Sequence, residues 1–355
     1  MRLLDLFSGI GGFHLGFERA GFEFDYVGFA EVDKYASAVY KYNFPFSEEL
    51  GDVRSIQSEN LPKIDIITFG SPCQDFSIAS KRAGLNGTRS SLIWEAIRLI
   101  TECKPRVFVW ENVKGTFSSN NGADFWAIIQ AFTNIGSYRL EWELLNTRWF
   151  LPQNRERLYL VGYTGDRGGR SVFPIGEPSQ SNDHRNTKVA NTLQHPGHSG
   201  GNYRGMTMIA DYRNDEGLRV RKDSVSPTLA TRKHSQTDIS TMPPFVWKDT
   251  VQPVLTPNRA NKRQDGRRFK EDGEDMFTLT QQDQHGVKIN KTSIRRLTPV
   301  ECMRLQGFPD DWNEFGVFDG KKVAISDTQR YKQAGNAVTV DVVQAVAEKI
   351  WPLKC

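Results

Sequence analysis

The sequence is poor in the residues that hold small or metal-dependent folds together. It has four cysteines among 355 residues and only six histidines. The cysteines are scattered, without the C-x-x-C spacing of a zinc or redox motif, and they are too few for a disulfide scaffold. We therefore expect no metal centre and a reducing, cytoplasmic setting. The four cysteines are Cys73, Cys103, Cys302 and Cys355.

Long apolar stretches and a strong net charge are also missing. No stretch approaches the roughly 18 consecutive apolar residues of a membrane-spanning helix, so we expect no membrane association. Asp5 comes too early in the chain for a secretion signal. The net charge of +4 permits a nucleic-acid partner without requiring one. Positive residues nevertheless gather between residues 204 and 296.

The pattern of apolar residues divides the chain into two parts. Over residues 1–163, short apolar segments alternate with segments of helical periodicity, which predicts a doubly wound α/β sheet. Residues 165–290 are polar and loop-rich, and helical periodicity returns at 298–350. We predict an α/β domain of residues 1–180 with 326–355, and a smaller, basic, loop-rich domain of residues 181–325. Strands are predicted at 3–7, 26–30, 64–69, 107–110, 140–146 and 158–162, and helices at 13–20, 34–42, 92–101, 124–135 and 338–350.

A glycine-rich loop, residues 7–12 (FSGIGG), lies between the first predicted strand and the first helix. Backbone N–H groups at a helix start favour a nucleotide-like or carboxylate-bearing ligand. Glu31 ends the second strand, 20 residues beyond Gly11, where an acid can bond ribose hydroxyls. Dinucleotide binding is the alternative, but its G-x-G-x-x-G pattern needs a glycine where His14 stands. The loop therefore favours a nucleoside.

A second motif, residues 70–74 (GSPCQ), follows the apolar run 64–69. It places Cys73 at the mouth of a buried strand, where a thiol is exposed and rigidly held. Those are the conditions for a nucleophilic thiolate. A small buried hydrophobic residue is the alternative.

Together, six blocks in this order resemble the bacterial type of DNA (cytosine-5) methyltransferase. The resemblance implies a Rossmann-like methyltransferase sheet, S-adenosyl-L-methionine as methyl donor, S-adenosyl-L-homocysteine as product and double-stranded DNA as substrate. Residues 165–290 have no comparable match and correspond to the variable target-recognition region of the family. The blocks are 5–13 (DLFSGIGGF), 70–74 (GSPCQ), 111–113 (ENV), 153–157 (QNRER), 296–302 with 306–309 (RLTPVEC, QGFP), and 333–338 (QAGNAV).

The resemblance implies a catalytic role for four residues. Cys73 attacks C6 of cytosine, and Glu111 donates or shares a proton at N3. That role requires an apolar site that keeps the Glu111 carboxyl protonated near neutral pH. Arg157 contacts the cytosine carbonyl, and Arg155 stabilises the negative charge nearby. The alternatives are a helix-start acid for Glu111 and surface charges for the two arginines.

The resemblance also implies the cofactor contacts. Phe7 lies against the adenine, Glu31 holds the ribose, and Asp52 meets the adenine amino group. Val32 is a looser match, because the family often has a larger residue there. The implied cofactor-binding residues are Phe7, Gly9, Gly11, Gly12, Glu31, Val32, Asp52, Pro72, Asn336 and Val338.

DNA binding is expected in two places. The reacting carbon is stacked inside the duplex, so the base must be flipped out, and residues 75–91 are expected to close over the DNA. In the recognition region, two similar basic segments, 217–223 and 266–272, are each followed by a Thr-Leu pair that predicts a strand. The expected DNA contacts are Gln74, Ser77, Lys81, Arg82, Arg89, Arg219, Arg221, Arg232, Arg267 and Arg268.

Two other functions fit the same scaffold. One is a transfer-RNA cytosine-5 methyltransferase of the DNA-methyltransferase-like type, against which the long polar insertion at 165–290 argues. The other is a non-catalytic DNA-binding regulator, against which Cys73, Glu111 and Arg157 argue. We expect a monomer of bacterial or phage origin that acts on nucleoid DNA, with a cognate restriction endonuclease as a partner that the resemblance allows.

Overall fold

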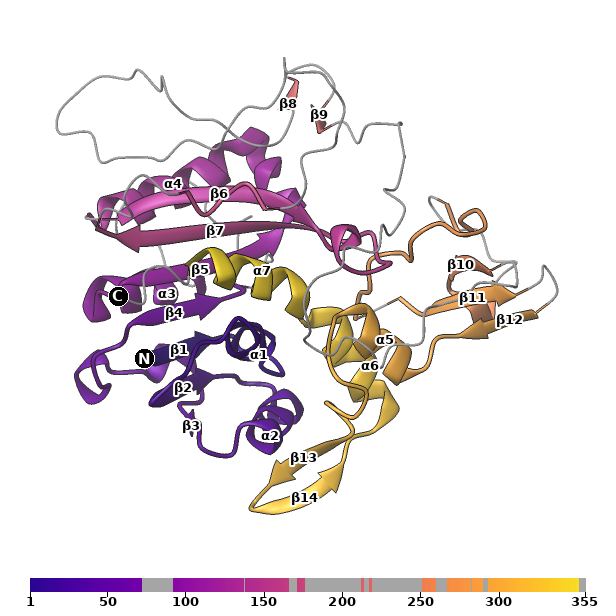
Figure 1. Cartoon of the computed structure of the whole chain (residues 1–355), viewed down its shortest axis with the longest axis horizontal. Coiled ribbons are helices and arrows are strands. Elements are labelled where there is room, and N and C mark those ends of the chain that lie inside the picture. Colours follow the sequence, from indigo (N-terminus) through magenta and orange to yellow (C-terminus); the bar gives the residue numbers. More distant parts are fainter. Residues whose placement is uncertain are drawn as a thin grey trace.

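The computed structural model describes residues 1–71, 92–136, 138–165, 171–175, 212–213, 217–218, 251–259, 267–281, 283–289 and 293–350. A seven-stranded sheet in the order β3-β2-β1-β4-β5-β7-β6 forms its centre (Figure 1). Strands β3, β2, β1, β4 and β5 run parallel, whereas β7 is antiparallel to both β5 and β6. The predicted α/β sheet is confirmed. Its strands are β1 Arg2–Leu6, β2 Tyr26–Ala30, β3 Glu48–Glu49, β4 Ile66–Phe69, β5 Val107–Val113, β6 Tyr138–Asn146 and β7 Glu156–Thr164.

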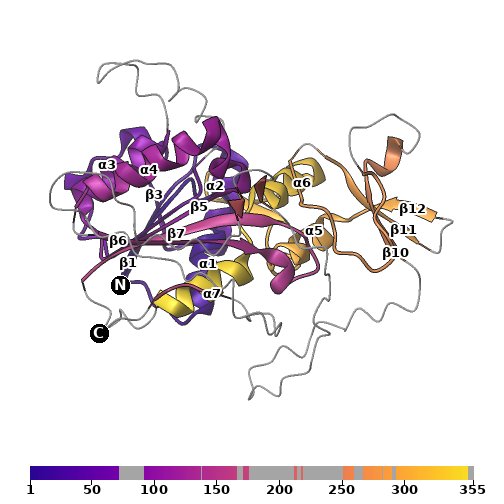
Figure 2. The ribbon, with the colours of Figure 1, turned by 90° about the horizontal axis from the view of Figure 1, so that it is seen from above.

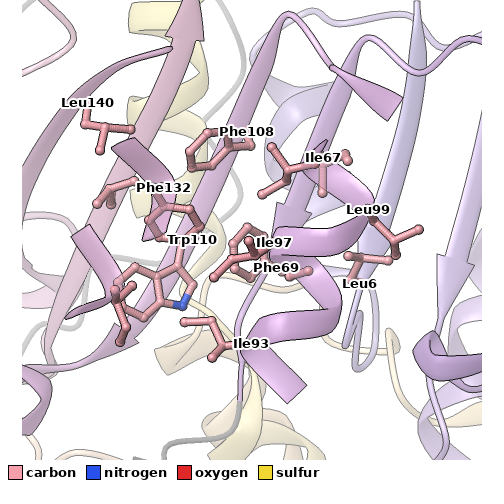
Figure 3. Packing of buried hydrophobic residues seen from close by; sticks show 14 of the residues in the cluster. Leu6, Ile67, Phe69, Ile93, Ile97, Leu99, Phe108, Trp110, Phe132 and Leu140 are labelled. Carbon is pink, nitrogen blue, oxygen red and sulfur yellow. The ribbon is translucent and has the colours of Figure 1, made fainter. Parts of the chain in front are cut away.

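Helices cover both faces of this sheet (Figure 2). Helices α3 and α4 lie on one face, and α1 and α7 lie on the other. On the first face, Phe132 of α4 is fully buried against Phe108 and Trp110, in a cluster that α3 completes (Figure 3). Truncating Phe132 to alanine would cost about 3–5 kcal/mol. The helices are α1 Gly12–Arg19, α2 Lys34–Asn43, α3 Leu92–Cys103, α4 Ala123–Asn134, α5 Pro299–Leu305, α6 Asp327–Asn336 and α7 Val340–Ile350.

The C-terminal helix packs against the first helix of the chain. A Cβ atom at Gly16 of α1 would come 2.5 Å from Cγ1 of Val343 in α7, so the two helices approach closely at this glycine. The apolar face of α7 follows a helical spacing, with Val343, Val346 and Ile350 buried. The last part of the chain therefore returns to the α/β domain.

A second, smaller set of strands lies beside the main sheet. Strands β10 Val251–Leu255, β11 His285–Ile289 and β12 Ser293–Arg296 form an antiparallel sheet, and α5 and α6 lie between it and the main sheet (Figures 1 and 2). The predicted strand at Thr278-Leu279 is wrong, because residues 277–280 have no strand structure. Its counterpart at Thr228-Leu229 lies outside the described residues. The remaining strands are β8 Tyr212–Arg213, β9 Gly217–Leu218, and the hairpin β13 Phe315–Phe318 with β14 Lys321–Ala324.

Residues 299–325 pack on the α/β domain and also contact the three-stranded sheet, where Arg295 of β12 pairs with Glu301 of α5 at 2.7 Å. Nε1 of Trp312 donates a hydrogen bond to the Ile10 carbonyl at 2.9 Å, and Nδ2 of Asn43 donates to the Trp312 carbonyl at 2.9 Å. Met303 and Trp312 also share a buried cluster with Tyr40 of α2. The predicted boundary at residue 326 assigns this segment to the recognition domain, and that boundary stays a prediction.

Candidate active site

A cavity of about 500 Å³ opens at the carboxyl ends of β1, β2, β4 and β5. In α/β sheets, ligands bind at this edge, and the volume lies within the range of ligand pockets, about 300–1,000 Å³. The cavity brings the glycine-rich loop together with the predicted base contacts. Of the predicted residues, Phe7, Gly9, Glu31, Val32, Asp52, Glu111, Arg155, Arg157 and Asn336 line it.

The glycine-rich loop turns sharply between β1 and α1. Gly11 precedes the helix with a φ of 87°, a left-handed conformation that favours glycine. A Cβ at Gly12 would come 2.6 Å from Cγ2 of Val338, so this glycine lets the segment after α6 pack closely. Phe7 and Gly9 line the cavity, whereas Gly11, Gly12 and Val338, which are also predicted to bind the cofactor, are not among its lining residues.

Glu31 joins the ends of the first two strands. One carboxylate oxygen accepts the Gly9 N–H at 2.9 Å, and the other accepts the Asp33 N–H at 2.8 Å. Burial raises the pKa of Glu31 above its ordinary value, and these backbone donors oppose the increase. A carboxylate has about four lone-pair sites, so acceptor capacity remains for ligand hydroxyls.

Two further ion pairs stand around the cavity. Asp33, which caps the N-terminus of α2, lies 2.5 Å from Nζ of Lys332 in α6. Asp52 lies 2.5 Å from the Arg54 guanidinium, whose hydrogen bonds lower the pKa of Asp52. Neither Lys332 nor Arg54 was predicted from the sequence. The one signal in the sequence was Asp33, an acid directly before a predicted helix, where a side chain caps the helix start. Val32 is 74% exposed, which leaves an apolar surface open to a ligand.

Glu111 and Arg157 form a pair on neighbouring strands. Oε1 of Glu111 lies 3.1 Å from Nε of Arg157, and both side chains are largely buried. Glu111 lies within β5, so the helix-start interpretation is wrong. An apolar site was also expected around the Glu111 carboxyl. This expectation is wrong in one respect, because the Arg157 guanidinium contacts that carboxyl. The pair presents an acid and a fork of N–H donors to the same cavity.

Arg155 is buried, with 3% of its surface exposed, so the surface-charge interpretation is wrong. It donates hydrogen bonds to the carbonyls of Leu279 at 3.0 Å, Gly335 at 3.4 Å and Ala337 at 2.8 Å. Burial lowers its pKa to about 9. These hydrogen bonds join Arg155 to two other segments of the chain beside the cavity. The predicted stabilisation of charge by Arg155 stays a prediction.

The segment that leads to Cys73 is anchored to β5. Oγ of Ser71 accepts hydrogen bonds from Nε1 of Trp110 at 3.1 Å and from Nδ2 of Asn112 at 3.3 Å. The Ser71 carbonyl also accepts from Asn112 at 3.1 Å. The structure thus fixes a residue two positions before the predicted nucleophile. Residues 72–91 lie outside the described residues, and with them Pro72, Cys73, Gln74, Ser77, Lys81, Arg82 and Arg89.

The predicted DNA contacts of the recognition region are described only in part. Arg267 is half exposed and pairs with Glu274 at 2.7 Å. The Arg268 carbonyl accepts the N–H of Leu255 at 3.0 Å, which joins this segment to β10. Their role in DNA binding stays a prediction. Arg219, Arg221 and Arg232 lie outside the described residues.

Within the described part of the chain, no group of three or more His, Cys, Asp or Glu side chains is placed to hold a metal ion. No helix among those residues is long and apolar enough to cross a bilayer.

Comparisons with known proteins give the family of the chain. The family model for C-5 cytosine-specific DNA methylase matches residues 1–351. The chain is 32% identical over 431 aligned residues to the orphan methyltransferase M.SPRI of Bacillus phage SPR, covering 99% of this chain and 97% of that protein. It is 31% identical over 365 residues to the type II methyltransferase M.Bsp6I of Bacillus sp. (strain RFL6), covering 99% and 98%.

Among solved structures, the S. pombe Dnmt2 methyltransferase matches with a TM-score of 0.60 and 19% identity over the whole of both chains. This likeness shows the shared fold. Fold and relatives together define a methyltransferase. More particularly, the chain belongs to the C-5 cytosine-specific DNA methylase family.

Proposed function

We propose that the protein transfers a methyl group from S-adenosyl-L-methionine to C5 of a flipped cytosine in a specific sequence of duplex DNA. The observation that carries the proposal is a single cavity that joins Glu31, at the glycine-rich loop, to the Glu111–Arg157 pair. The family model, which is described as C-5 cytosine-specific DNA methylase, favours DNA as the substrate.

The residues around the cavity fit this cofactor. Glu31 is held by two backbone donors and keeps acceptor capacity for ribose hydroxyls. Val32 and Phe7 offer apolar surface to a flat base, and Asp52 offers an acceptor to its amino group. When bound, S-adenosyl-L-methionine supplies the methyl group on its sulfonium. We propose no metal in this reaction.

The proposed chemistry begins with the Cys73 thiolate, which forms a bond to C6 of the cytosine and makes C5 electron-rich. C5 would then bond to the methyl carbon while the bond between that carbon and the cofactor sulfur breaks, with S-adenosyl-L-homocysteine as the leaving group. The C5 proton then passes to water, the C6–sulfur bond breaks, and the thiolate is regenerated. Glu111 shares a proton at N3 as charge develops on the ring. Arg157, 3.1 Å from Glu111, orients that carboxyl and donates to the cytosine carbonyl.

Methyl transfer to duplex DNA tests this function. Bisulfite sequencing of DNA from an expressing host should reveal one methylated sequence, and tritiated methyl transfer to that duplex should be lost in Cys73→Ala. Cys103→Ala is the matched control, because Cys103 lies in α3, away from the cavity, and burial raises the pKa of its thiol to about 11. An active Cys73→Ala enzyme would contradict the proposal.

The substrate can be separated from transfer RNA by competition. Unlabelled target duplex should suppress methyl transfer to labelled duplex, and unlabelled transfer RNA should not. The likeness to the S. pombe Dnmt2 methyltransferase does not decide the substrate, because at 19% identity it shows the fold alone.

We further propose that the protein works as a monomer in the cytoplasm, on nucleoid DNA of a bacterium or of a phage host. Because one relative is a type II methyltransferase, we also propose that a cognate restriction endonuclease can accompany the protein in the same system. Orphan relatives favour a solitary enzyme. An extract of the source cells that cuts the unmethylated target duplex and spares the methylated one would indicate a cognate endonuclease, and an extract that cuts neither would favour a solitary enzyme.

A further inference from the structure

Arg155 connects two segments that are far apart in the sequence. Its Nη1 donates to the carbonyls of Leu279 and Gly335, and its Nη2 donates to the carbonyl of Ala337. These carbonyls come from two different parts of the chain, and the guanidinium between them is 3% exposed. The planar fork of an arginine fixes the direction of each N–H, so both segments must be in place for Nη1 and Nη2 to make these bonds, whereas the buried Nε has no hydrogen-bond partner among the described residues.

One of these segments, residues 276–281, leads into the three-stranded sheet. It is held to the loop before β7, since the Leu279 N–H donates to Oε1 of Gln153 at 2.9 Å and the Asn154 N–H donates to the Met276 carbonyl at 3.0 Å. At its end, Gln281 reaches the cavity, and β11 begins four residues later. Of the three carbonyls that Arg155 bonds, that of Leu279 is therefore the nearest to this sheet along the chain.

The other segment forms part of the cofactor side of the cavity. Gly335 and Ala337 flank Asn336, and all three line the cavity. A Cβ at Gly335 would come 2.4 Å from the carbonyl carbon of Thr280, so the end of α6 lies directly on the first segment. The two segments are thus in contact, and Arg155 bonds both.

We propose that Arg155 is a positioning residue that couples DNA binding to cofactor binding. DNA that orders residues 276–281 fixes the carbonyl of Leu279, and Arg155 then holds Gly335 and Ala337 in the geometry that the cofactor requires. The inference rests on the proposed function of the cavity. Coupling of this kind is reciprocal, so each ligand raises the affinity for the other by the same factor.

The test is a binding cycle on the full chain. Calorimetry gives the dissociation constant of S-adenosyl-L-homocysteine with and without a duplex that carries the methylated sequence, and of the duplex with and without S-adenosyl-L-homocysteine. In the wild type, each ligand should lower the dissociation constant of the other by about fivefold or more. In Arg155→Lys this factor should fall below about twofold. Arg155→Lys keeps the charge and loses the planar fork.

Arg148→Lys is the matched control. Arg148 lies in the same loop and pairs with Asp275 at 3.1 Å, next to the same segment, but it has no contact with Gly335 or Ala337 among the described residues. It should keep the wild-type coupling factor. If Arg155→Lys does not melt cooperatively, Gln153→Met, which removes the bond to Leu279, should reduce the factor instead.

Several results would overturn the inference. They are a wild type in which the two ligands bind independently, a folded Arg155→Lys with the wild-type factor, or equal losses in Arg155→Lys and Arg148→Lys. An unchanged factor in Gln153→Met would do the same where Arg155→Lys fails to fold. Failure of the proposed function itself looks different, because the wild type would then bind no S-adenosyl-L-homocysteine or transfer no methyl group.

Discussion

Replacing Glu31 with glutamine tests the cofactor end of the cavity. Glu31 now accepts one backbone N–H on each carboxylate oxygen, from Gly9 and from Asp33. Glutamine has nearly the same size but only one oxygen. Its amide NH₂ must therefore face one of these N–H donors, and that backbone group loses its partner. The negative charge offered to ligand hydroxyls is lost as well.

The expected magnitude follows from the number of interactions lost. A hydrogen bond to a charged group contributes about 1.5–3 kcal/mol, and Glu31→Gln removes the charged partner of a ligand hydroxyl. One such loss corresponds to a rise of about 10- to 150-fold in the dissociation constant of the cofactor. Loosening of the Gly9 loop acts in the same direction.

Calorimetry with S-adenosyl-L-homocysteine measures this change, and thermal unfolding reports whether the variant is folded. Glu49→Gln is the control, because Glu49 lies on the next strand, β3, pairs with Lys41 at 2.7 Å and does not line the cavity. It should bind as tightly as the wild type. A dissociation constant for Glu31→Gln within about threefold of the wild type would refute the role of Glu31.

Three further predictions concern the acid, the fold and the recognition region. Glu111→Gln should lower single-turnover methyl transfer by about 10²–10⁴-fold, and a rate near that of the wild type in rapid-quench experiments would remove Glu111 from the mechanism. Burial raises the pKa of Glu143, which accepts the Ile175 N–H at 2.8 Å, to about 7 from 4.5. The wild type should therefore lose stability as the pH rises through this interval. Glu143→Gln should abolish up to about 3 kcal/mol of that loss in the free energy of unfolding, measured by urea unfolding at different pH values. The same change of the free energy of unfolding with pH in the variant and the wild type would contradict this prediction. Replacing Arg267 and Arg268 together with alanine should weaken binding to all duplexes and flatten the salt dependence of that binding, and an unchanged salt slope would mean that both side chains belong to a solvated surface.

Local patterns in the sequence predicted most of the sheet. The apolar segment at 26–30 is the strand Tyr26–Ala30, and the periodic segment from Leu92 is a helix that continues to Cys103. Glu31 was readable for the same reason, because a motif at a fixed distance from the first loop locates the end of the second strand. These patterns depend only on residues that are close together along the chain, so they can be read from a single sequence.

Long-range contacts were not readable in the same way. The reversal of β7 depends on its pairing with β5 and β6, and its apolar pattern would suit a parallel strand equally well. Arg155 and Arg157 look like alternate residues of a strand edge. The burial of Arg155 is decided by the carbonyls of Leu279, Gly335 and Ala337, more than 120 residues away.

The measurement that tests the central claim most directly is covalent trapping on a duplex that contains 5-fluorocytosine at the methylated position. Fluorine cannot leave C5 as a proton does, so the bond between Cys73 and C6 should persist after methyl transfer. The wild type should form a protein–DNA adduct that survives denaturation and depends on S-adenosyl-L-methionine. Cys73→Ala should form none, while still binding the duplex and S-adenosyl-L-homocysteine. An adduct formed equally well by Cys73→Ala, or no adduct from an active wild type, would contradict the proposed mechanism.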